Sequence, residues 1–199
     1  MTAGLILAAG ESRRMGTPKA LLRYRGETFL DTLIGRFEAR CAPVIVVVGA
    51  AAQAIRGGAS RAATFVENEQ WRSGQTSSMQ CGLRAVPAEA AGVLFTLVDH
   101  PAVTMETIDA LLEASATGGR RTAQPPLLCV PRYQGRHGHP IWFSLGLIAE
   151  FLALAEPGAA RDVVRAHAKE TEFVDVEDAG VVTNIDDPAA YRALIEAQR

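Results

Sequence analysis

The chain has 199 residues, of which 48% are hydrophobic and 21% are charged, and its formal net charge is −2. This length predicts one domain spanning residues 1–199, and the composition excludes an intrinsically disordered protein and a coiled coil. The slightly negative charge argues against a general nucleic-acid-binding protein, because such proteins carry broad basic surfaces.

Four short apolar runs in the first half predict β-strands, and segments with helical periodicity separate them. The strands are expected at residues 5–8, 44–48, 63–66 and 93–98, and the helices at 29–39, 50–55 and 77–86. Repetition of strand and helix predicts an α/β fold with a mostly parallel sheet and helices on both faces. Ligands of such sheets bind beyond the carboxyl ends of the strands, so the loops leaving those strands should carry the site.

The second half departs from this alternation. A helix over 104–114 is expected to be capped by Thr104 with Glu106 in its first turn, and 117–126 is loop-like. Residues 127–131 and 139–143 predict two strands joined by a polar, glycine-containing turn. Further helices are expected at 145–154, 160–168 and 188–197, the last with Asp187 as N-cap. We therefore expect a small β elaboration on the sheet.

Targeting signals and cysteine patterns give little indication of a specialised compartment. The apolar stretch 4–9 is shorter than a signal peptide, and no run approaches the roughly 20 apolar residues of a membrane helix. We expect a cytoplasmic protein with no membrane partner.

The three cysteines, Cys41, Cys81 and Cys129, are far apart and form no CxxC pattern, which argues against a disulfide framework and a zinc site. Each is expected to be a small buried hydrophobic residue.

The loop after the first predicted strand has the features of a phosphate site. The small residues Ala8, Ala9 and Gly10 let a ligand approach the main chain and leave backbone N–H groups available to an anion. Arginine and lysine side chains follow at positions 13, 14, 19, 23 and 25, against one acidic residue in this stretch. Guanidinium groups suit bidentate phosphate contacts, and a lysine ammonium acts as a mobile point charge.

These basic side chains are not equivalent. For Arg23 and Arg25, solvated surface arginines are the favoured interpretation. Gly16 and Pro18 would be unusual at a plain helix start, which favours a shaped loop presenting Arg14 and Lys19. The stretch has neither the spacing of a P-loop nor a dinucleotide-binding glycine pattern.

Residues 7–19, with the sequence LAAGESRRMGTPK, resemble the signature of nucleotidyltransferases that move NMP from an NTP to a small acceptor. The resemblance is greatest to the molybdenum cofactor cytidylyltransferase group of the MobA-like NTP transferases. It implies a Rossmann-like three-layer α/β/α sandwich of the nucleotide-diphospho-sugar transferase type. It also implies that the main chain from Leu7 through Ala8 and Ala9 to Gly10 holds the nucleotide, while Arg14 and Lys19 neutralise its phosphates.

Two carboxylates are candidates for a magnesium site. Asp99 follows the predicted strand 93–98, and Mg²⁺ favours one or two protein carboxylates with phosphate oxygens and water. Residues 97–101 resemble the family's metal-binding LxDxP element, and residues 184–188 resemble its DIDTP segment, which places Asp186 at a metal-binding position. Helix capping is the alternative for both aspartates. His100 stands where the group more often has Gln or Met, and is expected to line the acceptor pocket or to cover the strand end.

Three further elements resemble the same group. Residues 74–83 are similar to its GxxSSLxxGL element, which implies a loop-shaping role for Gly74 and a base contact for Ser77, with helix capping by Thr76 as a compatible alternative. The turn 135–140 is similar to the group's GxxGHP turn, which implies acceptor contacts from Gly138 and His139. Residues 158–161 resemble its GAR element, which gives Arg161 a role near an anionic acceptor or leaves it a surface arginine. Pairing of His137 with His139 at zinc is not expected.

The implied reaction is in-line attack by a phosphate of the acceptor on the α-phosphorus of an NTP. Arg14, Lys19 and Asp99 are the expected catalytic residues. Magnesium is the expected cofactor, held by Asp99 and Asp186. CTP is the expected donor, because Ala9 stands where relatives that use GTP tend to have a second glycine, and molybdopterin is the acceptor by analogy. Another phosphorylated acceptor, such as methylerythritol phosphate or a sugar phosphate, is the nearest alternative. A non-catalytic nucleotide-binding partner of a molybdoenzyme is an alternative of another class. No flavin or nicotinamide fingerprint favours a redox enzyme.

Overall fold

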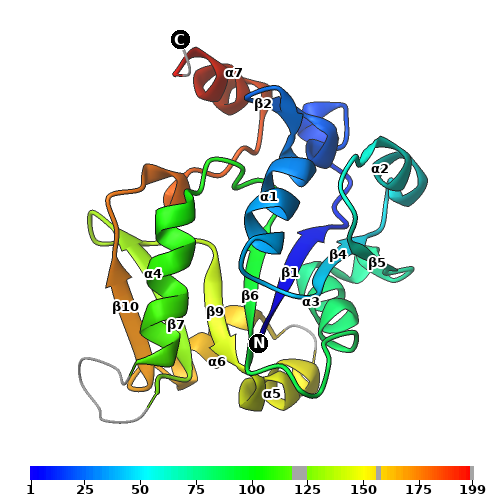
Figure 1. Cartoon of the computed structure of the whole chain (residues 1–199). Helices are drawn as coiled ribbons and strands as arrows, with labels where there is room; N and C mark the ends of the chain where they lie inside the picture. Colours follow the sequence, from blue (N-terminus) through cyan, green and yellow to red (C-terminus); the bar gives the residue numbers. More distant parts are fainter. Residues whose placement is uncertain (118–124, 156–157, 198–199) are drawn as a thin grey trace.

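The computed structural model describes residues 1–117, 125–155 and 158–197. In these residues an eight-stranded sheet has the order β10-β7-β9-β6-β1-β4-β5, with β8 paired to β7 (Figure 1). Its strands are β1 Thr2–Ala8, β4 Val44–Val48, β5 Thr64–Glu67, β6 Gly92–Leu97, β7 Leu128–Tyr133, β8 Arg136–His137, β9 Ile141–Ser144 and β10 Thr171–Asp175. A separate hairpin pairs β2 Arg23–Tyr24 with β3 Glu27–Thr28.

The central strands are parallel, as predicted. β1 pairs in parallel with both β4 and β6, and β4 pairs in parallel with β5. All five residues of β4 are buried, which is typical of a strand covered on both faces. β9 is antiparallel to both of its neighbours and β10 is parallel to β7. The predicted elaboration of the second half therefore continues the sheet beyond β6.

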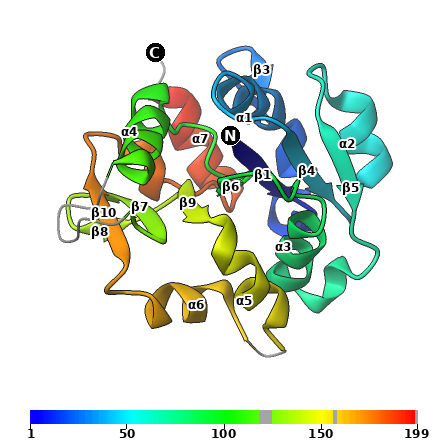
Figure 2. The ribbon, with the colours of Figure 1, turned by 60° about the horizontal axis from the view of Figure 1, so that its bottom comes forward.

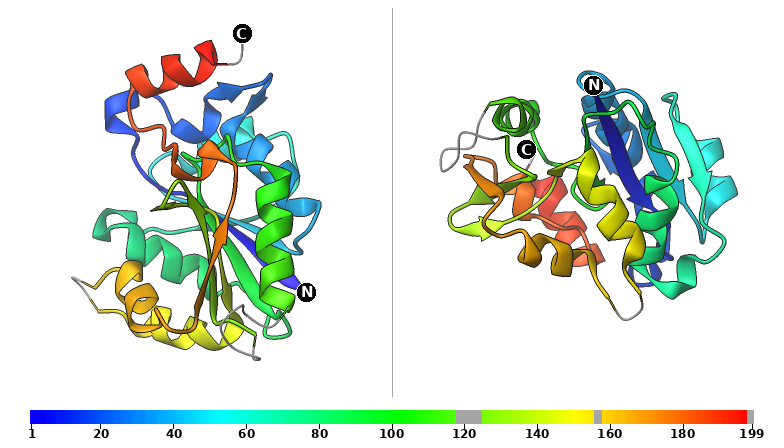
Figure 3. Two further views of the ribbon diagram at one scale, coloured as in Figure 1. Left: turned by 90° about the vertical axis from the view of Figure 1, so that its left-hand side faces the viewer. Right: turned by 90° about the horizontal axis from the view of Figure 1, so that it is seen from below.

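Helices cover both faces of the sheet and form the outer layers (Figures 2 and 3). They are α1 Phe29–Glu38, α2 Ala52–Gly58, α3 Gln75–Leu83, α4 Met105–Ala116, α5 Ile148–Ala153, α6 Ala160–Ala166 and α7 Pro188–Glu196. Side chains of β1 alternate between two cores: Ile6 packs with α1, α2 and α4, whereas Leu5 packs with α3, α5 and α6. The predicted three-layer α/β/α sandwich is confirmed.

Several local predictions are also confirmed and others are wrong. The Thr104 side chain accepts a hydrogen bond at the start of α4, and Asp187 accepts two at the start of α7. β10 and the hairpin of β2 and β3 were not predicted, because short strands with charged residues have little hydrophobic periodicity. Most of the loop predicted over 117–126 lies outside the described residues. Cys41 and Cys129 are buried as expected, but Cys81 is only partly buried.

In the described part of the chain, no helix is long and apolar enough to span a membrane.

A buried carboxylate ties the segment before α7 to the start of α4. Asp178 is 8% exposed, and it accepts hydrogen bonds from the Thr104 N–H (2.8 Å), the Thr107 hydroxyl (2.7 Å) and the Gly180 N–H (2.8 Å). Buried carboxylates need such donors, because burying an unpaired charge is costly. These bonds fix the path of residues 178–186 across the upper end of the sheet in Figure 1.

Asp178→Ala should lower the free energy of unfolding by about 3 kcal/mol, because it leaves buried donors without an acceptor. The matched control is Asp109→Ala, which removes a carboxylate from an exposed ion pair with Arg40 on the same face of the molecule. Such a pair contributes at most about 1 kcal/mol. Urea denaturation of both variants measures the difference, and equal losses would contradict the anchoring role of Asp178.

Candidate active site

A cavity of about 650 Å³ opens at the carboxyl ends of the central strands. Its wall comes from the loop after β1, the segment leading into α3, the end of β6 and the segment before α7. The lining residues are Leu7, Ala8, Ala9, Gly10, Glu11, Ser12, Arg13, Arg14, Pro18, Lys19, Ala20, Ile55, Trp71, Arg72, Gly74, Gln75, Ser78, Leu97, Val98, Asp99 and Asp186. The cavity therefore lies at the edge of the sheet where parallel α/β folds bind their ligands.

The loop after β1 folds back on itself before it reaches Lys19. Ser12 has φ 54° and Gly16 has φ 69°, and both therefore lie in the left-handed region. The Ser12 hydroxyl accepts a hydrogen bond from the Lys19 N–H (3.0 Å), which closes the loop. The predicted role of Gly16 in shaping the loop agrees with its conformation. Arg14 and Lys19 are thereby brought to the same side of the cavity.

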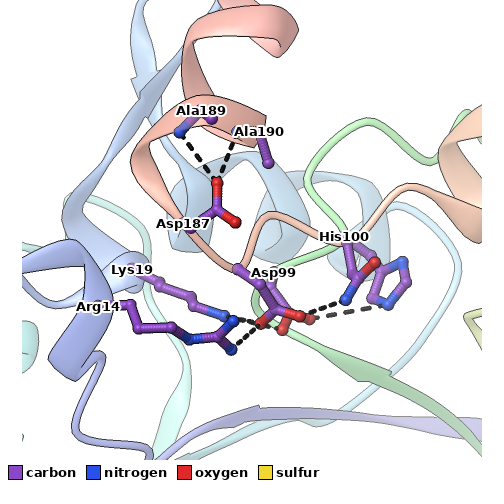
Figure 4. A network of polar contacts seen from close by, with 9 residues as sticks. Arg14, Lys19, Asp99, His100, Asp187, Ala189 and Ala190 are labelled. Carbon is purple, nitrogen blue, oxygen red and sulfur yellow. Dashed lines mark hydrogen bonds and ion pairs between the residues drawn. The ribbon is translucent and has the colours of Figure 1, made fainter.

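Two carboxylates and two cations meet at one end of this cavity (Figure 4). Lys19 Nζ lies 3.2 Å from Asp99 Oδ2 and 2.6 Å from Asp186 Oδ1. A guanidinium nitrogen of Arg14 lies 3.4 Å from Asp186 Oδ1. The Lys19 side chain is only 14% exposed and that of Asp99 16%, whereas that of Arg14 is 67% exposed at the rim. The four side chains that the sequence predicted at the phosphate and metal positions are therefore neighbours.

The local fold explains why Asp186 lies beside Asp99. The Ile185 N–H donates a hydrogen bond to the Asp99 carbonyl (2.9 Å), which joins the segment before α7 to the end of β6. The hydrogen bond from Lys19 lowers the pKa of the Asp186 carboxyl, and the charges of Lys19 and Arg14 act in the same direction. The Asp186 carboxylate therefore presents negative charge to the cavity.

These carboxylates fit a divalent cation that is shared with phosphate oxygens. Among the described residues, Asp99 Oδ1 is buried without a hydrogen-bond partner, so this carboxylate has acceptor capacity that the protein itself does not use. No group of three or more His, Cys, Asp or Glu side chains that could hold a metal ion is found in the described ranges. Two carboxylates completed by phosphate oxygens and water match the coordination that Mg²⁺ favours.

At the other end of the cavity, the position of Ser77 differs from the predicted one. Ser77 does not line the cavity, because its hydroxyl lies against the Gly74 carbonyl (2.8 Å) and the Gln70 carbonyl (3.1 Å). Ser78 lines it instead. Its Oγ accepts a hydrogen bond from Asn68 Nδ2 (3.0 Å), and in the described structure its hydroxyl hydrogen has no acceptor. Ser78 can therefore donate a hydrogen bond to a ligand.

Other features of the segment before α3 were missed or only partly foreseen. Gly74 has φ 104°, which agrees with its predicted role in shaping the loop. Thr76 does not cap α3, because its hydroxyl donates to the Gly158 carbonyl (3.1 Å). Trp71 and Arg72 were not predicted, yet both line the cavity, and the Arg72 guanidinium lies 4.2 Å from the centroid of the Trp71 ring. A lone Trp-Arg pair gave no motif by which to find them.

None of the four residues predicted on the acceptor side lines the cavity. His100 is 6% exposed and lies behind Asp99, with its ring centroid 5.1 Å from that of His139. Burial lowers the pKa of His100, and lowers that of His139 to about 3, so both rings are neutral at neutral pH. Gly138 packs against the Val181 backbone. Arg161 is exposed in the first turn of α6.

The two histidines of the HxH pattern face different surroundings. The His137 ring stacks on Phe173, with centroids 4.5 Å apart and an interplanar angle of 14°. The His139 ring contacts Phe95 and His100 instead. No metal role follows for this pair.

Comparison with known proteins agrees with this geometry. The family model described as "MobA-like NTP transferase domain" matches residues 4–171. Nicotine blue oxidoreductase of Paenarthrobacter nicotinovorans is 33% identical over 187 residues, which cover 92% of this chain and 91% of that protein. A probable molybdenum cofactor guanylyltransferase of Mycobacterium avium is 28% identical over 200 residues, covering 98% and 96%. The manganese complex of Rv0371C from Mycobacterium tuberculosis H37Rv is 27% identical, covers 98% of both chains and has a TM-score of 0.78.

Proposed function

The chain belongs to the family of MobA-like NTP transferases and is a nucleotidyltransferase, and we propose that it transfers CMP from CTP to molybdopterin with release of pyrophosphate. The observation that carries the proposal is the meeting of Lys19 with Asp99 and Asp186 at one end of the cavity. A cation and two carboxylates at the carboxyl ends of parallel strands suit a triphosphate and its divalent metal.

The proposed reaction needs positioning and charge neutralisation rather than covalent catalysis. A phosphate oxygen of the acceptor forms a bond to the α-phosphorus of CTP, and the bond from that phosphorus to the α,β-bridging oxygen breaks. Pyrophosphate leaves with the bonding electron pair. Lys19 and Arg14 bind the negatively charged phosphate oxygens and stabilise the charge that accumulates on them. Asp99 and Asp186 would hold Mg²⁺, which when bound supplies further neutralisation of phosphate charge.

The nucleotide would lie with its phosphates toward Lys19 and its base toward α3. Main-chain N–H groups between Leu7 and Gly10 would contact it, where small side chains permit close approach. Gly74 would keep the opposite loop open. Ser78, in place of Ser77, would donate its hydroxyl hydrogen to an acceptor atom of the base or ribose.

The two substrates are supported unequally. We propose CTP because of the residue at position 9. Relatives that use GTP tend to have a second glycine there, whereas this chain has Ala9. GTP is the competing donor, because the M. avium relative is named a guanylyltransferase. The molybdenum cofactor in that name supports a molybdopterin acceptor. Arg161 is the one predicted acceptor residue that the structure leaves exposed at the surface, and we retain it as a proposed anion contact.

Turnover with each of the four NTPs and molybdopterin in the presence of Mg²⁺ tests the proposal through pyrophosphate release. The expected result is release with CTP at a higher kcat/KM than with GTP. Preference for GTP would overturn the donor, and release only with another phosphorylated acceptor would overturn molybdopterin. A parallel assay tests for reduction of nicotine blue, because of the 33% identity to the oxidoreductase. Reduction without any nucleotidyl transfer would overturn the whole proposal.

Asp99→Asn should lower kcat/KM for this transfer by about 10²-fold or more and raise the Mg²⁺ concentration that gives half-maximal activity. The amide keeps the shape of the side chain but removes the charge that attracts the cation. Chelation of divalent metal should stop turnover of the unmodified protein, and added Mg²⁺ should restore it. Asp109→Asn, at the exposed ion pair with Arg40, is the control and should be unchanged. Full activity in excess chelator would contradict the metal site.

A further inference from the structure

His100 stands directly behind the carboxylate of Asp99, on the side away from Lys19 (Figure 4). Its Nε2 lies 3.7 Å from Asp99 Oδ1, the buried oxygen that has no hydrogen-bond partner among the described residues. The Gly180 backbone also approaches the ring, where it partly offsets the effect of burial that lowers the His100 pKa, whereas the buried Nδ1 has no hydrogen-bond partner among the described residues. One imidazole thus contacts both the carboxylate at the end of β6 and the segment that carries Asp186.

The same ring is held in place from a third direction. His139 packs against His100, with ring centroids 5.1 Å apart, and its backbone N–H donates to the Val181 carbonyl (2.9 Å). The segment after β6, the turn before β9 and the segment 180–186 therefore pack against one another. Within this packed region, His100, His139 and Val181 lie behind the two carboxylates and do not line the cavity.

We propose that His100 is a positioning residue that fixes the Asp99 carboxylate relative to Asp186, so that the two can share one divalent cation. The proposal rests on the proposed function only through the metal that those carboxylates hold. Groups that orient metal-binding side chains from behind commonly change metal affinity by 10–100-fold when they are removed. Burial distinguishes this role from the acceptor contact that the sequence predicted, because a side chain that is 6% exposed and outside the cavity wall has no surface to offer an acceptor.

Binding of Mn²⁺ tests the proposal without any turnover. Electron paramagnetic resonance would measure free Mn²⁺ during titration of the unmodified protein, His100→Leu, His100→Gln and the control His167→Ala, each with CTP present. Leucine fills the space without polar atoms, while glutamine keeps a polar group beside Asp99. His167 pairs with Glu150 on α5, away from the lining residues. We expect the Mn²⁺ dissociation constant to rise about 10–100-fold in His100→Leu, to recover mostly in His100→Gln and to stay unchanged in His167→Ala.

Steady-state kinetics separate positioning from substrate contact. If His100 positions Asp99, His100→Leu should raise the Mg²⁺ concentration that gives half-maximal activity, while the KM for the acceptor changes less than about twofold. A raised acceptor KM with unchanged Mn²⁺ affinity would overturn the proposal and restore the acceptor role. Unchanged Mn²⁺ affinity with loss of thermal stability would also overturn it, in favour of a packing role. Failure of the proposed function would give a different result. The unmodified protein would then show no turnover, although it binds Mn²⁺ and His100→Leu still weakens that binding.

Discussion

Lys19→Met should reduce kcat/KM for nucleotidyl transfer by about 10²–10³-fold. The Lys19 side chain is 14% exposed and its ammonium is held between Asp99 and Asp186, so its charge acts where little water screens it. A triphosphate entering the cavity brings negative charge to this position, and the methionine variant has no cation there to meet it. The loss should fall on kcat as well as KM, because charge on the departing pyrophosphate increases as the bond to the α-phosphorus breaks.

The matched control is Arg40→Met, which removes a cation from an exposed ion pair with Asp109 outside the cavity wall. Its kcat/KM should stay within about twofold, because exposed pairs contribute little. Lys19→Arg should recover only part of the activity, because a planar guanidinium cannot occupy the same narrow position between two carboxylates. Stopped-flow or steady-state pyrophosphate release measures all three, and a tenfold or smaller loss in Lys19→Met would argue against a role at the transferred phosphate.

The phosphate end of the site was predictable because its signals are local. Arg14 and Lys19 lie within one loop whose glycine and proline are unusual for a helix start, and Asp99 directly follows a continuous apolar strand. The carboxyl ends of parallel strands meet at one edge, so both signals point to the same place. Asp186 needed the family resemblance, because its approach to Asp99 depends on the Ile185 hydrogen bond and on the Asp178 anchor.

Sequence patterns could not decide which serine faces the base end of the cavity or how the predicted acceptor residues pack. Ser77 and Ser78 are adjacent on α3, and consecutive positions of a helix point about 100° apart, so a shift of one residue changes which hydroxyl faces the cavity. Asn68 donates a hydrogen bond to both hydroxyls, whereas the Gln70 carbonyl accepts one from Ser77, and neither Asn68 nor Gln70 was part of a motif. For His139, the resemblance pointed to the turn, but the packing of its ring against Phe95 and His100 appears only in the folded chain.

Gly138→Ala should lower the free energy of unfolding by about 3 kcal/mol and also impair catalysis. A Cβ at this position would lie 2.0 Å from the Val181 carbonyl oxygen and 2.5 Å from its carbonyl carbon. Both are backbone atoms. The Gly138 N–H donates to the Pro131 carbonyl of β7 (3.1 Å), and the His139 N–H donates to the Val181 carbonyl (2.9 Å), so residues 138–139 are held against both β7 and the segment 180–186. Relief of the clash must therefore move the segment 180–186, and Asp186 with it.

The control for Gly138→Ala is Gly146→Ala, where the nearest atom to an added Cβ is the Ser144 hydroxyl at 3.8 Å. This control should change stability by no more than about 0.5 kcal/mol. Thermal unfolding should show a fall of roughly 6–12 °C for Gly138→Ala, given the size of the chain. Mn²⁺ affinity should fall in the same variant at temperatures where it remains folded, because Asp186 is displaced. A stable Gly138→Ala protein with intact Mn²⁺ binding and a raised acceptor KM would instead mean that the glycine keeps space for substrate.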